Sequence, residues 1–165
     1  MKNSENLYLA LGTNLGDRAR NLGEVNDRLR DIVAISRVSH IYQTPPWGVI
    51  NQPDFLNQVV EAQSSLDPEE LLKSVKAIEK VMGRVPSERY SPRLIDIDIL
   101  IYGCWEFNSS DLIIPHPRML ERAFVLVPLA ELAPDLTLPN DTETIQERLN
   151  TLDQTGITRW EKSHG

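Results

Sequence analysis

Residues 94–101 read LIDIDILI and place two acidic side chains within an otherwise aliphatic segment. Because successive side chains on a strand point to opposite faces, Asp96 and Asp98 are expected to share one face. Two residues along a strand span roughly 6.6 Å, so the carboxylates can straddle two metal ions spaced about 3.5–4 Å, as in two-metal phosphoryl chemistry. Ligands that are all oxygen favour Mg²⁺ over zinc. The opposite face is expected to pack against helices through Ile95, Ile97, Ile99 and Ile101.

The alternative for this segment is a strand with one face exposed to solvent, on which the two aspartates are merely hydrated. Asp is depleted in strands, which argues against a chance occurrence of two of them. Two carboxylates this close also repel each other and raise one pKa, and a divalent cation removes that conflict. The segment therefore favours a metal site.

Basic residues surround this segment in the sequence. Residues 83–93 carry Arg84, Arg89 and Arg93 with one acid, a local charge of +2 in a chain of −7. A second group, His116, Arg118 and Arg122, follows the next turn. Arginine forks match phosphate oxygens, so carboxylates that hold metal beside such groups suit a polyphosphate. The alternative is a set of solvated arginines paired with surface acids, which contributes little.

A proline-rich loop offers a different kind of site. Residues 44–48 read TPPWG, and Phe55 and Asn57 follow closely, with Phe124 further along. Aromatic faces beside an amide fit a flat heterocycle that forms hydrogen bonds. Phe55 and Phe124 could equally be core residues, so this pattern is weak by itself.

Composition and absent motifs exclude several function classes. With 165 residues, a net charge of −7 and a pI of about 5.0, the chain is expected to be one domain, 1–165, that does not bind nucleic acid. The single cysteine, Cys104, and the absence of a long apolar run indicate a soluble cytoplasmic protein. There is no P-loop, no Rossmann fingerprint and no zinc pattern.

The strands and helices that carry these residues are predicted to follow a βαββαβ order. Strands are predicted at residues 7–11, 35–42, 55–62 and 95–102. One helix follows the spacing of Leu22, Val25, Leu29 and Ile32, and a second begins at the N-cap Asp67 and ends at Gly83. This order predicts an α+β, ferredoxin-like antiparallel sheet with both helices on one face and the other face open for a ligand. A hairpin (105–114), helices near 119–132 and 144–149, and a peripheral tail after about 150 complete the prediction.

On these residues the sequence resembles the 6-hydroxymethyl-7,8-dihydropterin pyrophosphokinase family. The resemblance runs from residue 8 to about residue 139, and its most specific stretch is PRLIDID at 92–98. The other matching segments are TPPWG (44–48), QPDFLN (52–57), GRV (83–85), RYSPRLIDIDI (89–99) and PHPRMLERAFVLVPL (115–129). The sequence departs from the family pattern at Pro86, Asp111 and Pro117.

The resemblance implies an enzyme that moves pyrophosphate from ATP to the pterin alcohol, giving AMP and the pterin diphosphate in tetrahydrofolate biosynthesis. It implies two Mg²⁺ ions on Asp96 and Asp98, and catalytic roles for these two and for Arg84 and Arg93 of a mobile loop. It assigns ATP binding to Glu79, Arg89, Tyr90, His116 and Arg122. It assigns the pterin pocket to Gly12, Thr44, Pro45, Pro46, Trp47, Phe55, Asn57 and Phe124.

Two other functions stay open from the residues alone. One is another Mg²⁺-dependent nucleotidyl or phosphoryl transferase on the same sheet, which product analysis would distinguish. The other is a non-enzymatic βαββαβ module that binds RNA or a small ligand, which the acidic charge disfavours. For the pyrophosphokinase that the resemblance implies, a monomer is expected.

Overall fold

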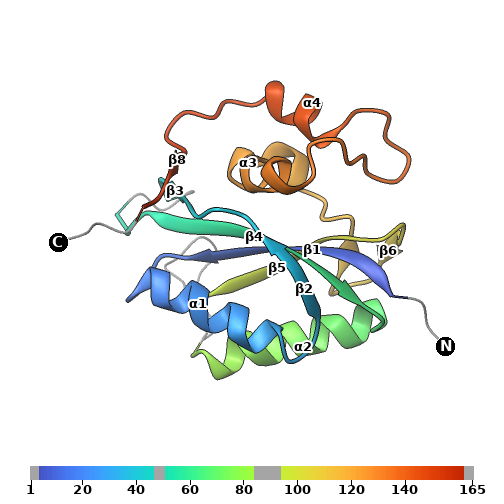
Figure 1. Ribbon diagram of the computed structural model, residues 1–165, viewed down its shortest axis with the longest axis horizontal. Coiled ribbons are helices and arrows are strands. Elements are labelled where there is room, and N and C mark those ends of the chain that lie inside the picture. Colours follow the sequence, from blue (N-terminus) through green and yellow to red (C-terminus); the bar gives the residue numbers. More distant parts are fainter. Residues whose placement is uncertain (1–3, 47–50, 84–93, 162–165) are drawn as a thin grey trace.

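Six strands form the central sheet in the computed structural model, which describes residues 4–46, 51–83 and 94–161 (Figure 1). Along the sheet the order is β5-β1-β4-β3-β8, with β2 also paired to β4, and every pairing is antiparallel. The strands are β1 (Glu5–Thr13), β2 (Ala34–Val38), β3 (Tyr42–Thr44), β4 (Phe55–Ser64), β5 (Asp96–Tyr102) and β8 (Thr158–Arg159). A separate two-stranded sheet joins β6 (Phe107–Asn108) and β7 (Ile113–Ile114).

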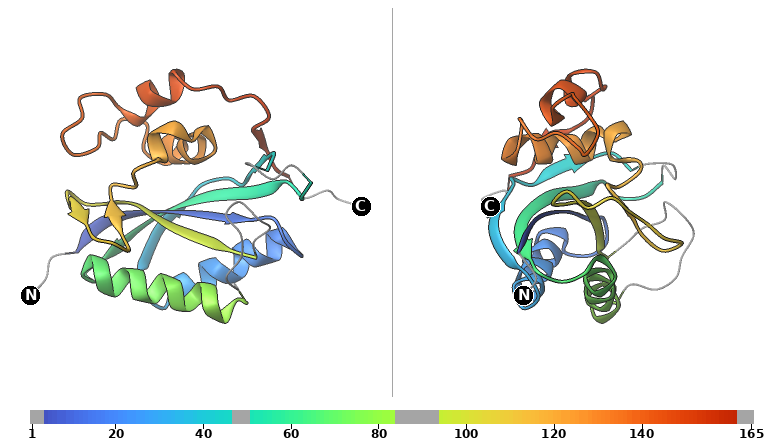
Figure 2. Two further views of the ribbon diagram at one scale, coloured as in Figure 1. Left: turned by 180° about the vertical axis from the view of Figure 1, so that it is seen from behind. Right: turned by 90° about the vertical axis from the view of Figure 1, so that its right-hand side faces the viewer.

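Helices cover both faces of the central sheet (Figures 1 and 2). On one face lie α1 (Arg18–Leu29) and α2 (Pro68–Val81), as the sequence predicts. On the other face lie α3 (Ala123–Leu132), preceded by the 3-10 turn η1 (Met119–Glu121), and α4 (Ile145–Asn150). The expectation that this second face is open is therefore only partly right, because α3 and α4 cover part of it.

Two apolar cores correspond to the two faces. The first packs α1 and α2 on the sheet and includes Leu9, Val25 and Val75, all fully buried. The second packs α3 and α4 on the opposite face and includes Leu126 and Leu129. Burial of this apolar area drives the sheet and its two helical layers to form one unit. The site can therefore rest on β1, β4 and β5, which contribute residues to both cores.

The start of α2 agrees with its sequence signal. The Asp67 backbone N–H donates to the Glu70 carboxylate at 3.1 Å, which is one half of a capping box. Pro68 occupies the first helical position, and Gly83 follows the helix end with φ +90°. The predicted helix is thus confirmed, and it places its later turns beside β5.

The predicted alternation along β5 holds only for its first half. Ile95, Ile97 and Ile99 belong to the first core, as expected. The pairing with β1 shifts register after Ile99, so that Leu100 is an extra residue in a β-bulge. Because the bulge reverses the alternation, Ile101 packs in the second core together with Leu100, and its assignment to the helix-facing side is wrong.

The strand predicted at residues 35–42 is divided into β2 and β3. Between them a side-chain oxygen takes the place of a backbone carbonyl, since the Ser39 Oγ accepts the Val59 backbone N–H at 3.0 Å. The same Oγ donates to the His40 carbonyl at 2.7 Å, which turns the chain away from the ladder. At the other end of the sheet, residues 158–159 of the predicted tail form β8 against β3.

Candidate functional site

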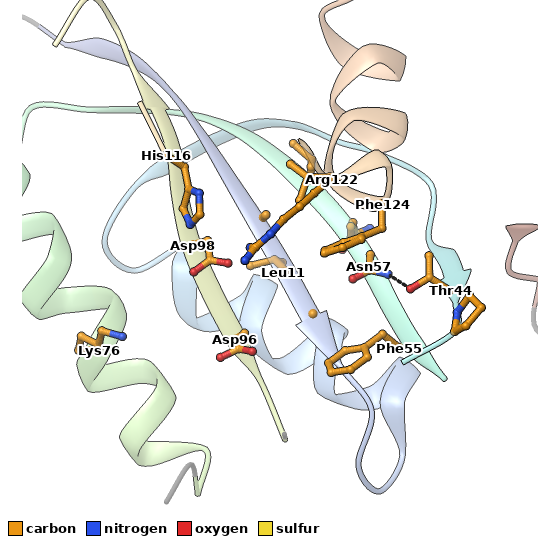
Figure 3. Close-up of a pocket in the computed structure, with 16 residues that line it drawn as sticks. Leu11, Thr44, Phe55, Asn57, Lys76, Asp96, Asp98, His116, Arg122 and Phe124 are labelled. Carbon is orange, nitrogen blue, oxygen red and sulfur yellow. Dashed lines mark hydrogen bonds between the residues drawn. The ribbon is translucent and has the colours of Figure 1, made fainter. Parts of the chain in front are cut away.

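A pocket of about 290 Å³ opens where β1, β4 and β5 pass the start of α3 (Figure 3). Ten residues that the sequence assigns to the site line it: Gly12, Thr44, Pro45, Phe55, Asn57, Asp96, Asp98, His116, Arg122 and Phe124. These residues come from segments up to about a hundred positions apart in the chain. The fold therefore brings the acidic, the basic and the aromatic groups to one cavity.

The floor of the pocket is a row of residues across three strands. Gly12 of β1 pairs with Asp96 on one side and with Asn57 on the other. Neighbouring strands lie about 4.8 Å apart, so Asp96 and Asn57 sit about 10 Å apart across this row. A Cβ on Gly12 would meet the Asn57 Oδ1 at 3.4 Å and the Phe55 ring at 3.8 Å. Glycine thus keeps the centre of the floor free of a side chain.

Asp96 and Asp98 lie on the pocket face of β5, both half-buried. Asp98 pairs with Ala10 of β1, so small residues stand next to both aspartates on the neighbouring strand. Within the described ranges no cluster of three or more His, Cys, Asp or Glu side chains could hold a metal ion. Two carboxylates on one strand face suit Mg²⁺, because this ion keeps waters and takes phosphate oxygens as further ligands.

The polar edge at the other end of the pocket is a buried pair of an amide and a hydroxyl, from Asn57 and Thr44. The Asn57 Nδ2 donates to the Thr44 Oγ1 at 2.8 Å. This hydrogen bond fixes the orientation of the amide and joins β4 to the end of β3. Phe55 and Phe124 lie at this same end of the pocket, away from Asp96 and Asp98 (Figure 3). An apolar, aromatic region with one oriented amide results.

Two further side chains, Arg122 and His116, complete the polar lining of the pocket. The guanidinium of Arg122 lies 5.8 Å from the centroid of the Phe124 ring, and it points toward Asp98 (Figure 3). Burial, helped by the charges of Arg122 and Arg118, lowers the pKa of His116 to about 4. The His116 Nδ1 accepts the Arg118 backbone N–H at 3.2 Å, so the ring proton of the neutral form is on Nε2. His116 is thus a neutral hydrogen-bond donor at pH 7.

Glu79, which the resemblance assigns to ATP binding, is buried beneath β5 instead of lining the pocket. Its Oε2 accepts the backbone N–H of Ile97 at 2.9 Å, the residue between the two aspartates. Its Oε1 lies 3.2 Å from the Lys76 ammonium. Glu79 therefore contacts the strand that carries the aspartates, and an ATP contact from it stays a prediction.

Lys76 is a pocket residue that the sequence interpretation missed. It reaches from α2 toward β5 and lines the pocket that holds Asp96 and Asp98 (Figure 3). The available signal was its spacing, since Leu72, Lys76 and Glu79 recur at i, i+4 and i+7 on one side of α2. Basic residues on an amphipathic helix are usually solvated, so this spacing alone did not single it out.

A second pocket adjoins the first on the side of the β6–β7 hairpin. Lys76, Asp98 and His116 line both pockets. The remaining lining residues are Leu72, Ile97, Ile99, Ser109, Ser110, Asp111, Leu112, Ile113 and Pro117. The departures from the family pattern at Asp111 and Pro117 therefore fall in this second pocket.

Several predicted residues are not placed by the structure. Trp47, Arg84, Arg89, Tyr90 and Arg93 lie outside the described residues. Pro46 is described and half-buried, but it does not line either pocket.

Comparison with known proteins gives consistent matches. The family model described as 7,8-dihydro-6-hydroxymethylpterin-pyrophosphokinase matches residues 8–134. A 2-amino-4-hydroxy-6-hydroxymethyldihydropteridine pyrophosphokinase of Methylorubrum extorquens is 44% identical over 156 residues, covering 93% of this chain and 98% of the relative. The protein of the same name from Bacillus subtilis is 40% identical over 161 residues, covering 96% and 92%.

Solved structures with the same fold include the wild-type HPPK-DHPS of Plasmodium falciparum with SDX-DHP. It matches with a TM-score of 0.74 over 91% of this chain and 44% of the longer one, at 17% identity. This likeness supports the fold alone.

Proposed function

We propose that the pocket on β1, β4 and β5 transfers pyrophosphate from ATP to 6-hydroxymethyl-7,8-dihydropterin, since the chain belongs to the 7,8-dihydro-6-hydroxymethylpterin-pyrophosphokinase family. The enzyme is an ATP-dependent pyrophosphokinase of folate synthesis, and its products are AMP and the pterin diphosphate. We also infer that the strand order β5-β1-β4-β2 is that of a ferredoxin-like βαββαβ unit.

The observation that carries the site assignment is the row Asp96–Gly12–Asn57 across the sheet. It places the Asp96 carboxylate and an oriented amide at opposite ends of a floor about 10 Å long, and Asp98 stands two residues further along β5. The pterin would lie at the amide end, where Asn57 and Thr44 meet its ring edge and Phe55 and Phe124 meet its faces. Its hydroxymethyl group would then point along the floor toward Asp96 and Asp98.

We assign the second pocket to the nucleoside of ATP. Residues 109–113 form one wall of it, and Leu72 adds an apolar side chain. The phosphates would cross the boundary between the two pockets, where Lys76 and His116 belong to both. Positive charge and a neutral donor at this boundary complement phosphate oxygens.

In the mechanism that follows, the pterin hydroxymethyl oxygen attacks the β-phosphorus of ATP in line with the departing AMP oxygen. Lys76 and Arg122 offset the negative charge that develops on the transferred group, and His116 donates its Nε2–H to a phosphate oxygen. Asp96 and Asp98 would hold two Mg²⁺ ions, which when bound neutralise phosphate charge and orient the reacting oxygens. Roles for Arg84, Arg89, Tyr90 and Arg93 stay predictions from the family resemblance.

Product analysis tests this function directly. The purified protein is incubated with ATP, Mg²⁺ and the pterin alcohol, and the products are separated by chromatography. Equal amounts of AMP and pterin diphosphate are expected, and AMP release should stop when the pterin is omitted. Release of ADP or of free pyrophosphate would instead identify a different Mg²⁺-dependent transferase.

A further inference from the structure

The end of the described chain packs against the wall of the pterin pocket. This C-terminal segment, residues 153–160, comprises a turn, β8 and Trp160. It lies beyond residues 8–134, which the family model matches. It nevertheless joins the central sheet next to β3, the strand that ends in Thr44 at the pocket.

β3 is held between two strands. On one side Tyr42, Gln43 and Thr44 pair with Asn57, Leu56 and Phe55 of β4. On the other side Tyr42 and Gln43 pair with Arg159 and Thr158 of β8. Without β8, this three-residue strand would be a sheet edge bordering the pocket, and short edge strands fray easily.

Trp160 extends this attachment beyond β8. Its backbone N–H donates to the carbonyl of Ile41 at 2.8 Å. Its half-buried side chain packs against the first core. The segment is therefore anchored at the residue that precedes β3.

Gly156 makes the contact nearest to the pocket. It has φ +85°, and a Cβ built on it would lie 3.1 Å from Cγ and 3.2 Å from Cδ of Pro45. The ring of Pro45 thus rests against the backbone of Gly156, and a Cβ there would force the ring to shift by a few tenths of an ångström. Pro45 in turn lines the pocket beside Thr44, which accepts the Asn57 hydrogen bond.

We propose that the C-terminal segment positions Thr44 and Pro45 for pterin binding, with Gly156 as the positioning residue. The proposal rests on the proposed function, because it names the pterin as the ligand of that wall. Gly156 acts through Pro45 and does not touch the substrate itself. None of residues 153–160 lines the second pocket, so we expect the segment to leave ATP binding unchanged.

The test compares Gly156→Ala with Gly103→Ala. Gly103 also has a positive φ, of +53°, but a Cβ there would meet the Glu5 side chain, remote from both pockets. Both variants carry backbone strain, and only the first alters the wall. For Gly156→Ala the KM for the pterin is expected to rise on the order of tenfold, while the KM for ATP stays that of the native enzyme. For Gly103→Ala neither KM should change.

Two further measurements separate positioning from general destabilisation. Amide hydrogen exchange of residues 42–44 should accelerate in Gly156→Ala and not in Gly103→Ala. In a Pro45→Ala background, Gly156→Ala should add little further loss of pterin affinity, since the contact it disturbs is already absent. Trp160→Ala should also raise the pterin KM, and Trp160→Phe should restore it.

The outcomes distinguish this proposal from the proposed function. If the native enzyme releases no AMP in response to the pterin, the proposed function is wrong. If the native enzyme is active and Gly156→Ala leaves the pterin KM unchanged, or raises both KM values equally, the positioning role is wrong.

Discussion

At the scale of single residues, the neighbouring carboxylates on β5 are the groups on which turnover should depend most. Replacing Asp96 or Asp98 with Asn keeps the shape of the side chain and removes the charge that attracts Mg²⁺. We expect kcat to fall on the order of 100-fold or more, with little change in the midpoint of thermal unfolding. Steady-state kinetics over a range of Mg²⁺ concentrations measures the effect.

A matched control for these variants is Asp27→Asn on α1. Asp27 is also acidic, but it is exposed and forms a surface ion pair with Arg30. Such pairs contribute little to stability, so turnover and unfolding should be nearly native. Near-normal turnover of the Asp98 variant at low Mg²⁺ would contradict the metal assignment.

His116 should give the free enzyme a pH-dependent stability. Its pKa in the folded protein is about 4, below the ordinary 6.5, because burial and the nearby arginines disfavour the charged ring. A lowered histidine pKa makes protonation favour the unfolded chain. The stabilising contribution is complete above pH 6.5 and is lost as the pH falls from 6.5 toward 4.

Urea unfolding of the native protein and of His116→Asn checks this sign. The native protein should lose more unfolding free energy than the variant between pH 6.5 and pH 4. A titration followed by NMR should show one imidazole signal, absent in the variant, that changes well below pH 6. If the His116 imidazole titrates near its ordinary pKa, the proposal that this ring is a neutral hydrogen-bond donor is wrong.

Sequence reasoning succeeds at this scale where residue type and spacing already limit the chemistry. Asp96 and Asp98 follow from strand periodicity alone, and the structure places both in the pocket. Lys76 was missed because a lysine on a helix surface is ordinary, and only the position of α2 against β5 gives it a role. Contacts of this kind depend on tertiary packing, which no local pattern encodes.

At the scale of elements, the bond between Glu79 and β5 connects α2 to the strand of the aspartates. Glu79→Ala leaves the Ile97 N–H buried without this acceptor, which should lower the free energy of unfolding by about 1–3 kcal/mol. Turnover should fall as well, since Ile97 stands between Asp96 and Asp98. Glu79→Gln retains an acceptor oxygen and should lose less of both.

Lys76→Ala is the complementary variant, measured by the same unfolding and kinetic experiments. The Lys76 side chain is 56% exposed, so loss of its pair with Glu79 should cost little stability. Its effect should appear as a lower kcat together with a higher KM for ATP, since Lys76 is placed against both the bound phosphates and the transferred group. If Glu79→Ala has the same free energy of unfolding as the native protein, the hydrogen bond from Ile97 to Glu79 does not hold β5 in place.

Element order is predictable here, and element details are not. The βαββαβ succession follows from hydrophobic periodicity and from the N-cap at Asp67, and the structure contains these elements. The bulge at Leu100 and the break at Ser39 arise from how strands meet their partners, so the local sequence does not reveal them. The pairing of β8 with β3 joins residues more than a hundred positions apart, beyond any periodic signal.

At the scale of the whole molecule, two cores on opposite sides of one sheet hold β1, β4 and β5, which form the floor of the pocket. The large apolar side chains that are exposed in the described part of the chain are few and scattered: Leu15, Val38, Val81, Trp105 and Ile113. Scattered exposure of this kind is ordinary for a monomer. We expect size-exclusion chromatography with light scattering to give a mass near 18.7 kDa.

None of the described helices has the length and apolar character needed to cross a membrane.

From the charge of the whole molecule we expect ATP to bind more weakly when the metal is absent. The chain carries −7 and places two carboxylates where the phosphates would lie, so a metal-free triphosphate meets repulsion. Calorimetry with a non-hydrolysable ATP analogue should show affinity at least about tenfold weaker when Mg²⁺ is removed by EDTA.

The double variant Asp96→Asn, Asp98→Asn should differ from the native protein in opposite directions with and without the metal. Without Mg²⁺ it should bind the analogue more tightly than the native protein, and with Mg²⁺ more weakly. Added salt should reduce the difference in metal-free affinity between the native protein and the double variant, because it screens these half-buried charges. Equal affinity of the native protein with and without Mg²⁺ would show that the phosphates lie away from β5.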